Sequence, residues 1–322
     1  MHQLSRIALD NVTKLDLEFA AAVIDGLSQF RKTLPCRYFY DARGSELFEM
    51  ITRLPEYYPA RTETEIIRVN AAEIMRGIAQ DSVLVEFGSG SSRKTEILLE
   101  VLPKLAAYVP IDVSHSALDD ATKRLAVRFP ALDVRPIIGN FSEPLSFPCD
   151  LTGRNKIGFF PGSTIGNMKA NEAIHLLSGM RESLSPRGRL IVGVDLKKDP
   201  QILVPAYDDA AGVTAAFNLN LLIRINRELG GSFDVSSFTH RASYNRDEGR
   251  IEMHLVSAKE QRARILGHSF KFACGESIHT ENSHKYSVKE FRSLCRSSGW
   301  SPRRVWLDEN ELFSVHELHT TD

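Results

Sequence analysis

The middle of the chain alternates short apolar runs with amphipathic segments. The apolar runs span residues 82–90, 106–114, 132–141, 156–164 and 188–196, and the amphipathic ones 91–105, 116–130 and 171–186. Short apolar strands that alternate with helices predict a parallel sheet covered by helices on both faces. We therefore expect a Rossmann-like, doubly wound α/β fold in this part of the chain.

The pattern changes after Leu196. Residues 199–229 are typical of a helix, and residues 238–272 of strands joined by polar turns, with Asp247-Glu248-Gly249 as a hairpin turn. Ser287 and Glu290 form a capping-box pattern that opens a helix, which Gly299 ends. Two further apolar runs, 301–309 and 311–318, close the chain.

These changes predict one α/β domain interrupted by an insertion. We expect an α/β domain over residues 62–198 and 287–322, and a second, α+β domain over residues 1–61 and 199–286. The second domain would bind the substrate, and the active site would be the cleft between the two.

Composition narrows the class of protein. In 322 residues, 43% are hydrophobic and 25% charged, with a net charge of -1 and no long basic run, which argues against nucleic acid as a partner. The four cysteines fit no disulfide or CxxC pattern. The sequence shows neither a signal peptide nor a membrane span. We expect a cytoplasmic enzyme with a small substrate, acting as a monomer without a membrane partner.

Two adjacent tyrosines lie between two prolines in the stretch RLPEYYPART, residues 53–62. Proline restricts its own φ and the residue before it, so the stretch is expected to be neither helix nor strand. One interpretation is a surface turn whose tyrosines pack on a neighbour. The other is a stiff wall of a binding pocket, in which Tyr57 contacts the ligand and Tyr58 packs.

The loop after the first predicted strand contains Gly88 and Gly90 but has Arg93 where a dinucleotide fingerprint needs a third glycine. Asp112 ends the second strand, and Asn140 with Phe141 ends the third. A carboxylate there accepts ribose hydroxyls, and the other two residues suit an adenine edge and face. Together they indicate a nucleoside without phosphates, such as S-adenosylmethionine (SAM). The alternative is that Asp112 and Asn140 are only polar residues that close strands.

The closing helix and two apolar runs resemble the layout of class I SAM-dependent methyltransferases. Several stretches are more specific: YFYDARGSELFEMITRLPEYYPARTE, VEFGSGSSRKT, FPGSTIGN, AYDDAAGVTAAFN, RIEMHL and HTENSHKY. Their order and spacing resemble the histidine-specific N-methyltransferases of ergothioneine biosynthesis, which trimethylate the α-amine of L-histidine to hercynine. The resemblance runs from about residue 37 to the C-terminus.

The resemblance implies roles residue by residue. For SAM, the co-substrate, it implies Gly88, Lys94, Asp112, Asn140 and Phe141. For histidine it implies Tyr57, Asn167, Tyr207, Glu281 and Ser283, with Tyr40, Phe48 and Met253 nearby, and it gives Tyr57 and Asn167 the catalytic roles. The position of Asn140 is typically Asp in this family. Because Asn keeps an acceptor but loses the charge, we expect weaker SAM binding and the same ligand.

Methyl transfer from a sulfonium to an amine suits these residue types. It is an in-line displacement that needs a neutral amine and no metal, so positioning supplies most of the rate. Asn167 and the hydroxyls of Tyr57 and Tyr207 can hold the amine and the carboxylate, and Glu281 can accept the imidazole N–H. HTENSHKY alone favours a solvated glutamate in a polar loop at Glu281, and the family resemblance reverses this preference.

Three other interpretations stay open on the sequence. A methyltransferase of this fold could act on another amino acid or amine, and the sheet could serve a nicotinamide-dependent oxidoreductase or a partner-binding module. We expect no metal, because HELH at 316–319 lacks the HExxH spacing. Asp208 and Asp209 could act as an acid–base pair, or cap a helix.

Overall fold

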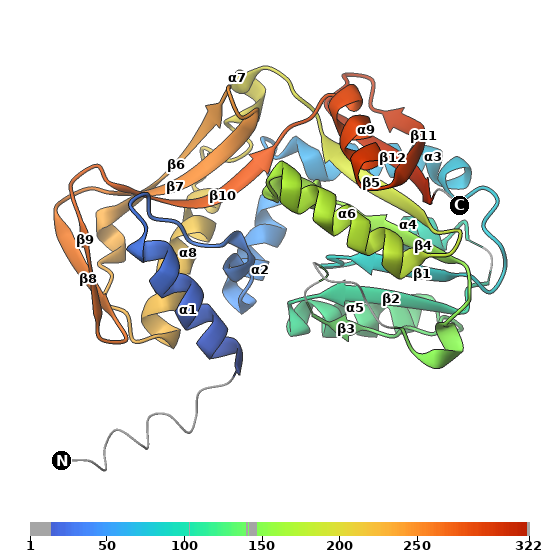
Figure 1. The fold of residues 1–322 in the computed structure, drawn as a ribbon, viewed down its shortest axis with the longest axis horizontal. Coiled ribbons are helices and arrows are strands. Elements are labelled where there is room, and N and C mark those ends of the chain that lie inside the picture. Colours follow the sequence, from blue (N-terminus) through green and yellow to red (C-terminus); the bar gives the residue numbers. More distant parts are fainter. Residues whose placement is uncertain (1–13, 103, 140, 142–146, 321–322) are drawn as a thin grey trace, which may run out of the picture. The chain divides into compact units, whose positions relative to one another are not determined.

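The computed structural model describes residues 14–102, 104–139, 141 and 147–320. The chain forms two compact units (Figure 1). The larger unit consists of Thr52–Ala206, Asn245–Arg250 and Asn282–Asp322, and the smaller of Met1–Ile51, Tyr207–Tyr244 and Ile251–Glu281. The predicted domains differ from this division at their edges and at Asn245–Arg250, which the prediction placed inside the second domain. The role of substrate binding given to the second domain stays a prediction.

The larger unit is built on a seven-stranded sheet in the order β11-β12-β5-β4-β1-β2-β3. The strands are β1 (Val83–Phe87), β2 (Ala107–Asp112), β3 (Ile137–Ile138), β4 (Lys156–Phe160), β5 (Arg189–Asp195), β11 (Trp300–Leu307) and β12 (Phe313–Thr320). Strands β1 to β5 pair in parallel, while β12 runs antiparallel to both β5 and β11. This confirms the doubly wound sheet of a class I methyltransferase, with its inserted antiparallel last strand.

Helices cover both faces of this sheet (Figure 1). They are α3 (Tyr58–Ile74), α4 (Arg93–Leu99), α5 (His115–Arg128), α6 (Ala170–Leu184) and α9 (Val288–Ser297). Strand β1 alternates between two apolar clusters, since Val85 packs with side chains of α6 and α9 and Leu84 with side chains of α3 and α4. Burial on both faces explains why the strands are continuous apolar runs in the sequence.

Several predicted boundaries needed correction. The helix expected over residues 91–105 spans only α4, and the third strand only the two residues of β3. The helical segment 199–229 is two helices, α7 (Pro200–Leu203) and α8 (Val213–Glu228). The break lies where Asp209 accepts hydrogen bonds from the backbone N–H groups of Val213 and Thr214, at 2.9 and 2.7 Å. Asp209 therefore caps a helix, as the second interpretation of the acidic pair held.

The stretch 53–62 was also predicted incorrectly. Helix α3 begins at Tyr58, with Pro59 in its first turn. Proline is tolerated there because the first backbone N–H groups of a helix have no partner within the helix. Residues 52–57 form the turn before it. Tyr58 is buried, in agreement with the prediction that it packs, and Tyr57 is partly exposed.

The smaller unit combines helices with antiparallel strands. Its elements include α1 (Lys14–Ser28), η1 (Cys36–Phe39), α2 (Ala42–Ile51), α8, the short helix η4 (Val235–Ser237) and the hairpin of β8 (Gln261–Ile265) and β9 (His268–Phe272). A three-stranded sheet has the order β10-β7-β6, from β6 (Phe238–Asn245), β7 (Arg250–Ser257) and β10 (Ser277–His284). The turn at 246–249 joins β6 to β7, which confirms the predicted hairpin.

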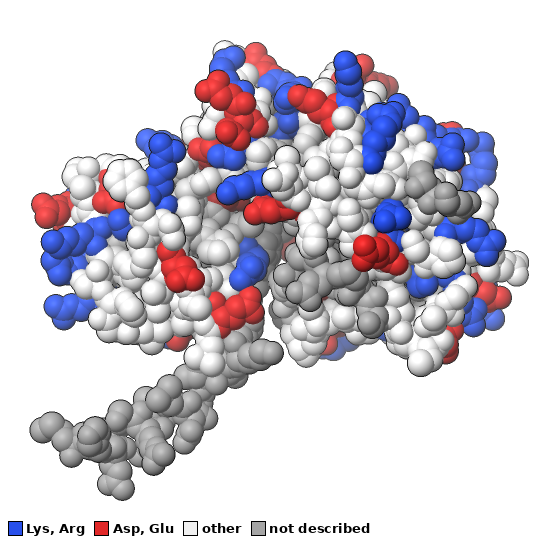
Figure 2. Space-filling view, in the orientation of Figure 1, with Lys and Arg blue, Asp and Glu red and all other residues white. Residues whose placement is uncertain are grey.

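The surface charge and the apolar length of the helices bear on the partners of the protein. Acidic and basic side chains are mixed on the face drawn in Figure 2. Across the residues with a described structure, we find no helix that combines the length and the apolar character needed to cross a membrane.

Candidate active site

The loop after β1 is tied to the end of β2 by backbone hydrogen bonds. The N–H of Gly88 donates to the carbonyl of Ile111 at 2.9 Å, and the N–H of Gly90 donates to Asp112 Oδ2 at 2.7 Å. The other carboxylate oxygen of Asp112 accepts from the N–H of Ser114 at 2.9 Å. Both glycines have positive φ, +71° and +49°, which glycine adopts without strain. Gly88 and Asp112 thus lie together, as predicted.

Phe141 lies against this loop. A Cβ atom at Gly88 would be 3.3 Å from Cε1 of Phe141, so glycine leaves room for the ring. The Phe141 ring also packs edge-on against Phe87 and Phe160, with centroids 6.4 and 5.6 Å away. The structure therefore brings Phe141 to the glycine loop, as the sequence predicted. Asn140 lies outside the described residues.

Lys94, predicted to contact SAM, lies in the first turn of α4 and forms an ion pair with Glu63. Glu63 is fully buried and also accepts from the backbone N–H of Gly162, at 3.0 and 2.9 Å to its two oxygens. This carboxylate connects α4 to the loop that follows β4. A contact of Lys94 with SAM stays a prediction.

Glu86 supports the loop from the interior of the sheet. It is buried and accepts a hydrogen bond from the hydroxyl of Tyr108, which also lies 2.9 Å from Ser92 Oγ. Burial raises the pKa of Glu86 to about 7, although the bond from Tyr108 opposes the rise. Glu86 is therefore a structural residue beneath the loop.

Asn167, one of the two predicted catalytic residues, ends the short helix η3 (Thr164–Asn167) after β4. Its side chain is partly exposed. The preceding Gly166 lies so close to the end of β10 that a Cβ atom would be 2.8 Å from the carbonyl oxygen of His284. Glycine at this position lets η3 pack directly on the backbone near Ser283, which is buried.

Five other predicted histidine-site residues lie in the smaller unit. The rings of Tyr40 and Phe48 are 5.5 Å apart, and both contact Phe217. The carbonyl of buried Tyr207 lies 2.8 Å from His240 Nε2, and that of Met253 accepts from the hydroxyl of Thr280 at 3.1 Å. The last of the five is Glu281, which is partly exposed.

The charge of Glu281 affects the pKa of the neighbouring Cys36 thiol. Burial raises the pKa of Cys36 to about 12, and the carboxylate of Glu281 adds to the rise. The predicted histidine-site residues fall into two sets. Tyr57, Asn167 and Ser283 belong to the larger unit, and the five residues described above belong to the smaller unit. The joint role of the two sets stays a prediction.

Comparison with known proteins identifies the family. The model of the family described as "Histidine-specific methyltransferase, SAM-dependent" matches residues 19–320. The chain belongs to this family. It is a SAM-dependent methyltransferase, so the oxidoreductase and partner-binding interpretations are wrong, and SAM is its co-substrate.

Similar proteins share this assignment. The histidine N-alpha-methyltransferase of Mycolicibacterium smegmatis is 42% identical over 288 residues, which cover 88% of this chain and 89% of that protein. That of Mycobacterium tuberculosis is 41% identical over 299 residues, 91% of this chain and 92% of that protein. Ergothioneine biosynthesis protein 1 of Neurospora crassa is 28% identical over 97% of this chain, which spans 36% of its length.

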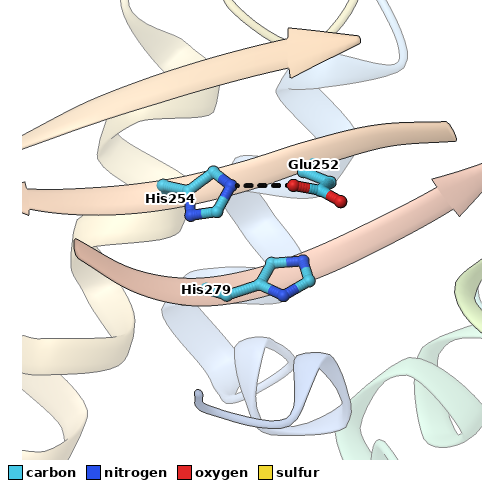
Figure 3. A group of neighbouring side chains, drawn as sticks. All are labelled: Glu252, His254 and His279. Atoms are coloured by element: carbon cyan, nitrogen blue, oxygen red, sulfur yellow. Dashed lines mark hydrogen bonds and ion pairs between the residues drawn. The ribbon is translucent and has the colours of Figure 1, made fainter. Parts of the chain in front are cut away.

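One group of possible metal ligands was missed in the sequence of this methyltransferase. Glu252 and His254 on β7 and His279 on β10 place their ligand atoms within 4.8 Å of one another (Figure 3). Their Glu-x-His alternation on one strand was the available signal. The two imidazole rings stack, with centroids 4.9 Å apart and planes 22° from parallel. Because ring nitrogens bind metals in the ring plane, this stacking does not suit one shared ion, and we assign none.

Proposed function

We propose that this methyltransferase transfers methyl groups from SAM to the α-amine of L-histidine, and that three transfers yield hercynine for ergothioneine biosynthesis. The family match over residues 19–320 carries the proposal. Two relatives of similar length that are named histidine N-alpha-methyltransferases support it.

The glycine loop fits the nucleoside part of SAM. Gly90 has no heavy atom within 4 Å of a Cβ position, so a ligand can approach its backbone closely. Asp112 keeps lone pairs for ribose hydroxyls besides its two backbone bonds, because a carboxylate offers about four acceptor sites. Bound SAM supplies an electrophilic methyl group on its sulfonium.

The histidine site would work by orientation and by neutral hydrogen-bonding groups. Tyr57 and Asn167, both partly exposed, would hold the amine in line with the methyl group, and Tyr207 the carboxylate. Glu281 would accept the imidazole N–H, with Ser283 as a second polar contact. A carboxylate placed to accept this N–H would disfavour side chains that offer no donor at that position.

The decisive experiment is to incubate the purified protein with SAM and each common amino acid separately, and to measure the added mass. We expect three methyl groups on histidine and none on the others. Methylation of a different amino acid would overturn the proposed substrate and keep the co-substrate. SAM binding without methylation of any amino acid would overturn the proposed class of substrate.

We further propose that the enzyme acts as a monomer in the cytoplasm. All four cysteines are free thiols, which suits a reducing compartment. Size-exclusion chromatography with light scattering should give one chain of 36.1 kDa, and a dimer mass would contradict the first half of this proposal.

A further inference from the structure

A buried aspartate at the end of β5 contacts three separate segments of the larger unit, two through its carboxylate and one through its backbone N–H. Asp195 is fully buried, and the hydroxyl of Tyr58 donates to it, 2.8 and 2.9 Å from its two oxygens. The ammonium groups of Lys198 and Lys285 lie 2.6 and 2.7 Å from Oδ1 and Oδ2. The backbone N–H of Asp195 donates to Ser163 Oγ at 2.9 Å.

These partners are neighbours of residues proposed to bind histidine. Tyr58 directly follows Tyr57, and Ser163 precedes the short helix that ends in Asn167. Lys285 donates to the hydroxyl oxygen of Ser283 at 2.7 Å. Each of the three segments is therefore held by a hydrogen bond or ion pair that leads directly to Asp195.

We propose that Asp195 is a positioning residue of the histidine site, which sets the mutual placement of the segments that contain Tyr57, Asn167 and Ser283. The inference rests on the proposed function. Asp195 would not touch the substrate itself, because its two oxygens are occupied by Tyr58, Lys198 and Lys285 inside the protein.

Electrostatics explain why the arrangement is specific. Burial would raise the pKa of Asp195, but the charges of Lys285 and Lys198 outweigh it and keep the pKa below its usual value. Burial in turn lowers the pKa of Lys198 to about 8. Apolar residues of similar volume would stabilise a fold at least as well as buried ions. The benefit we infer is therefore a fixed geometry, since each ion is satisfied in one arrangement only.

Lys285 also fixes the direction of one hydrogen bond. A lysine ammonium can only donate, so Ser283 Oγ is the acceptor in their contact. The hydroxyl hydrogen of Ser283 therefore points away from Lys285. The contact with Lys285 sets the orientation of the Ser283 side chain as well as its position.

The test compares Tyr58→Phe, Ser163→Ala and Asp195→Asn with a control at the opposite end of β5. Ser163→Ala removes the bond from the backbone N–H of Asp195, and Tyr58→Phe removes both the bond to Asp195 and the one that Lys198 donates to the hydroxyl at 2.7 Å. Both leave the buried charges paired, so they keep the test decisive if Asp195→Asn does not fold. The control is Glu317→Gln, which breaks the ion pair of Glu317 with Arg189 (2.9 Å), two largely buried side chains.

We expect Tyr58→Phe and Ser163→Ala each to lower kcat/KM for histidine by about tenfold, through a higher KM or a lower kcat. The SAM Kd should stay within about twofold of wild type. Glu317→Gln should lower the melting temperature comparably and leave the histidine parameters unchanged. If the kinetic losses instead follow the melting temperature in all variants, or if no variant changes them, Asp195 has no positioning role.

A second measurement separates this inference from the proposed substrate. Amide hydrogen exchange should become faster in residues 56–58 and 282–285 of Asp195→Asn, in residues 56–58 of Tyr58→Phe and in residues 163–167 of Ser163→Ala, and in none of these segments of Glu317→Gln. This readout needs no substrate, so it holds even if histidine is not methylated. Unchanged exchange, or acceleration spread evenly over the sheet, would overturn the inference.

Discussion

The backbone N–H of Gly90 donates to the carboxylate of Asp112 at 2.7 Å, so the loop after β1 and the end of β2 form one structure. The other oxygen of Asp112 accepts from Ser114, at the start of α5. Asp112 therefore shapes this loop, and in the proposed site it would offer its remaining lone pairs to the ribose of SAM.

We predict that Asp112→Asn weakens SAM binding by roughly 10- to 100-fold, because hydrogen bonds to a charged group contribute about 1.5–3 kcal/mol. The amide nitrogen of Asn cannot accept from a backbone N–H, so one of the two loop bonds is lost as well. Isothermal titration with SAM measures the effect, and Asp119→Asn on exposed α5 is the control. Equal SAM affinity in both variants would refute this role.

Gly88 tests the fit of the loop against Phe141. Gly88→Ala places a methyl group 3.3 Å from the Phe141 ring at a φ of +71°. Gly77→Ala is a matched control, because Gly77 has a φ of +77° with no atom within 4 Å. Both variants should lose about 1 kcal/mol of stability from backbone strain. Only Gly88→Ala should also weaken SAM binding, by several-fold in titration; equal SAM affinities would contradict a ligand role for this glycine.

The sheet could be predicted from the sequence because its strands are buried on both faces. Val83–Phe87 is apolar at nearly every position, so the strand is visible without any knowledge of its partners. The cap formed by Ser287 and Glu290 is equally local, and the structure confirms it. The glycine loop with Asp112 follows from the same rules, since carboxyl ends of parallel strands meet at one edge.

The partner of Tyr58 could not be predicted in this way. Its hydroxyl bonds to Asp195, which is 137 positions away in the chain. Local rules predicted a packed tyrosine in a segment without helix or strand, because the prolines dominate the nearby sequence. Long-range pairs such as Tyr58 with Asp195, or Lys285 with Asp195, leave no periodic signal, so only the folded chain reveals them.

Glu281 tests how the imidazole is recognised. Glu281→Gln keeps a carbonyl acceptor but removes the charge, and should raise the histidine KM by about tenfold. The SAM Kd should not change, because the glycine loop proposed to bind SAM lies in the larger unit. Steady-state kinetics with varied histidine measure the effect, with exposed Glu260→Gln as the control. A histidine KM that matches wild type would return Glu281 to its alternative interpretation as a solvated side chain.

Glu86 should make stability depend on pH in a defined direction. Its pKa is raised from 4.5 to about 7 in the folded protein. Its contribution to the free energy of unfolding is therefore largest below pH 4.5, where it is protonated in both the folded and the unfolded state. As the pH rises from 4.5 to 7, the unfolded chain ionises first and this contribution is lost, by up to about 3 kcal/mol at 1.36 kcal/mol per pKa unit.

Glu86→Gln isolates this effect, because Gln keeps an acceptor for Tyr108 and cannot ionise. Urea unfolding at pH 5, 6, 7 and 8 should show the variant gaining stability relative to wild type up to pH 7, and no further gain above it. Buried His316, whose pKa is lowered to about 3, acts in the opposite direction but is present in both proteins and cancels in the difference. A stability difference that stays constant from pH 5 to 8 would show that Glu86 ionises normally in the folded protein.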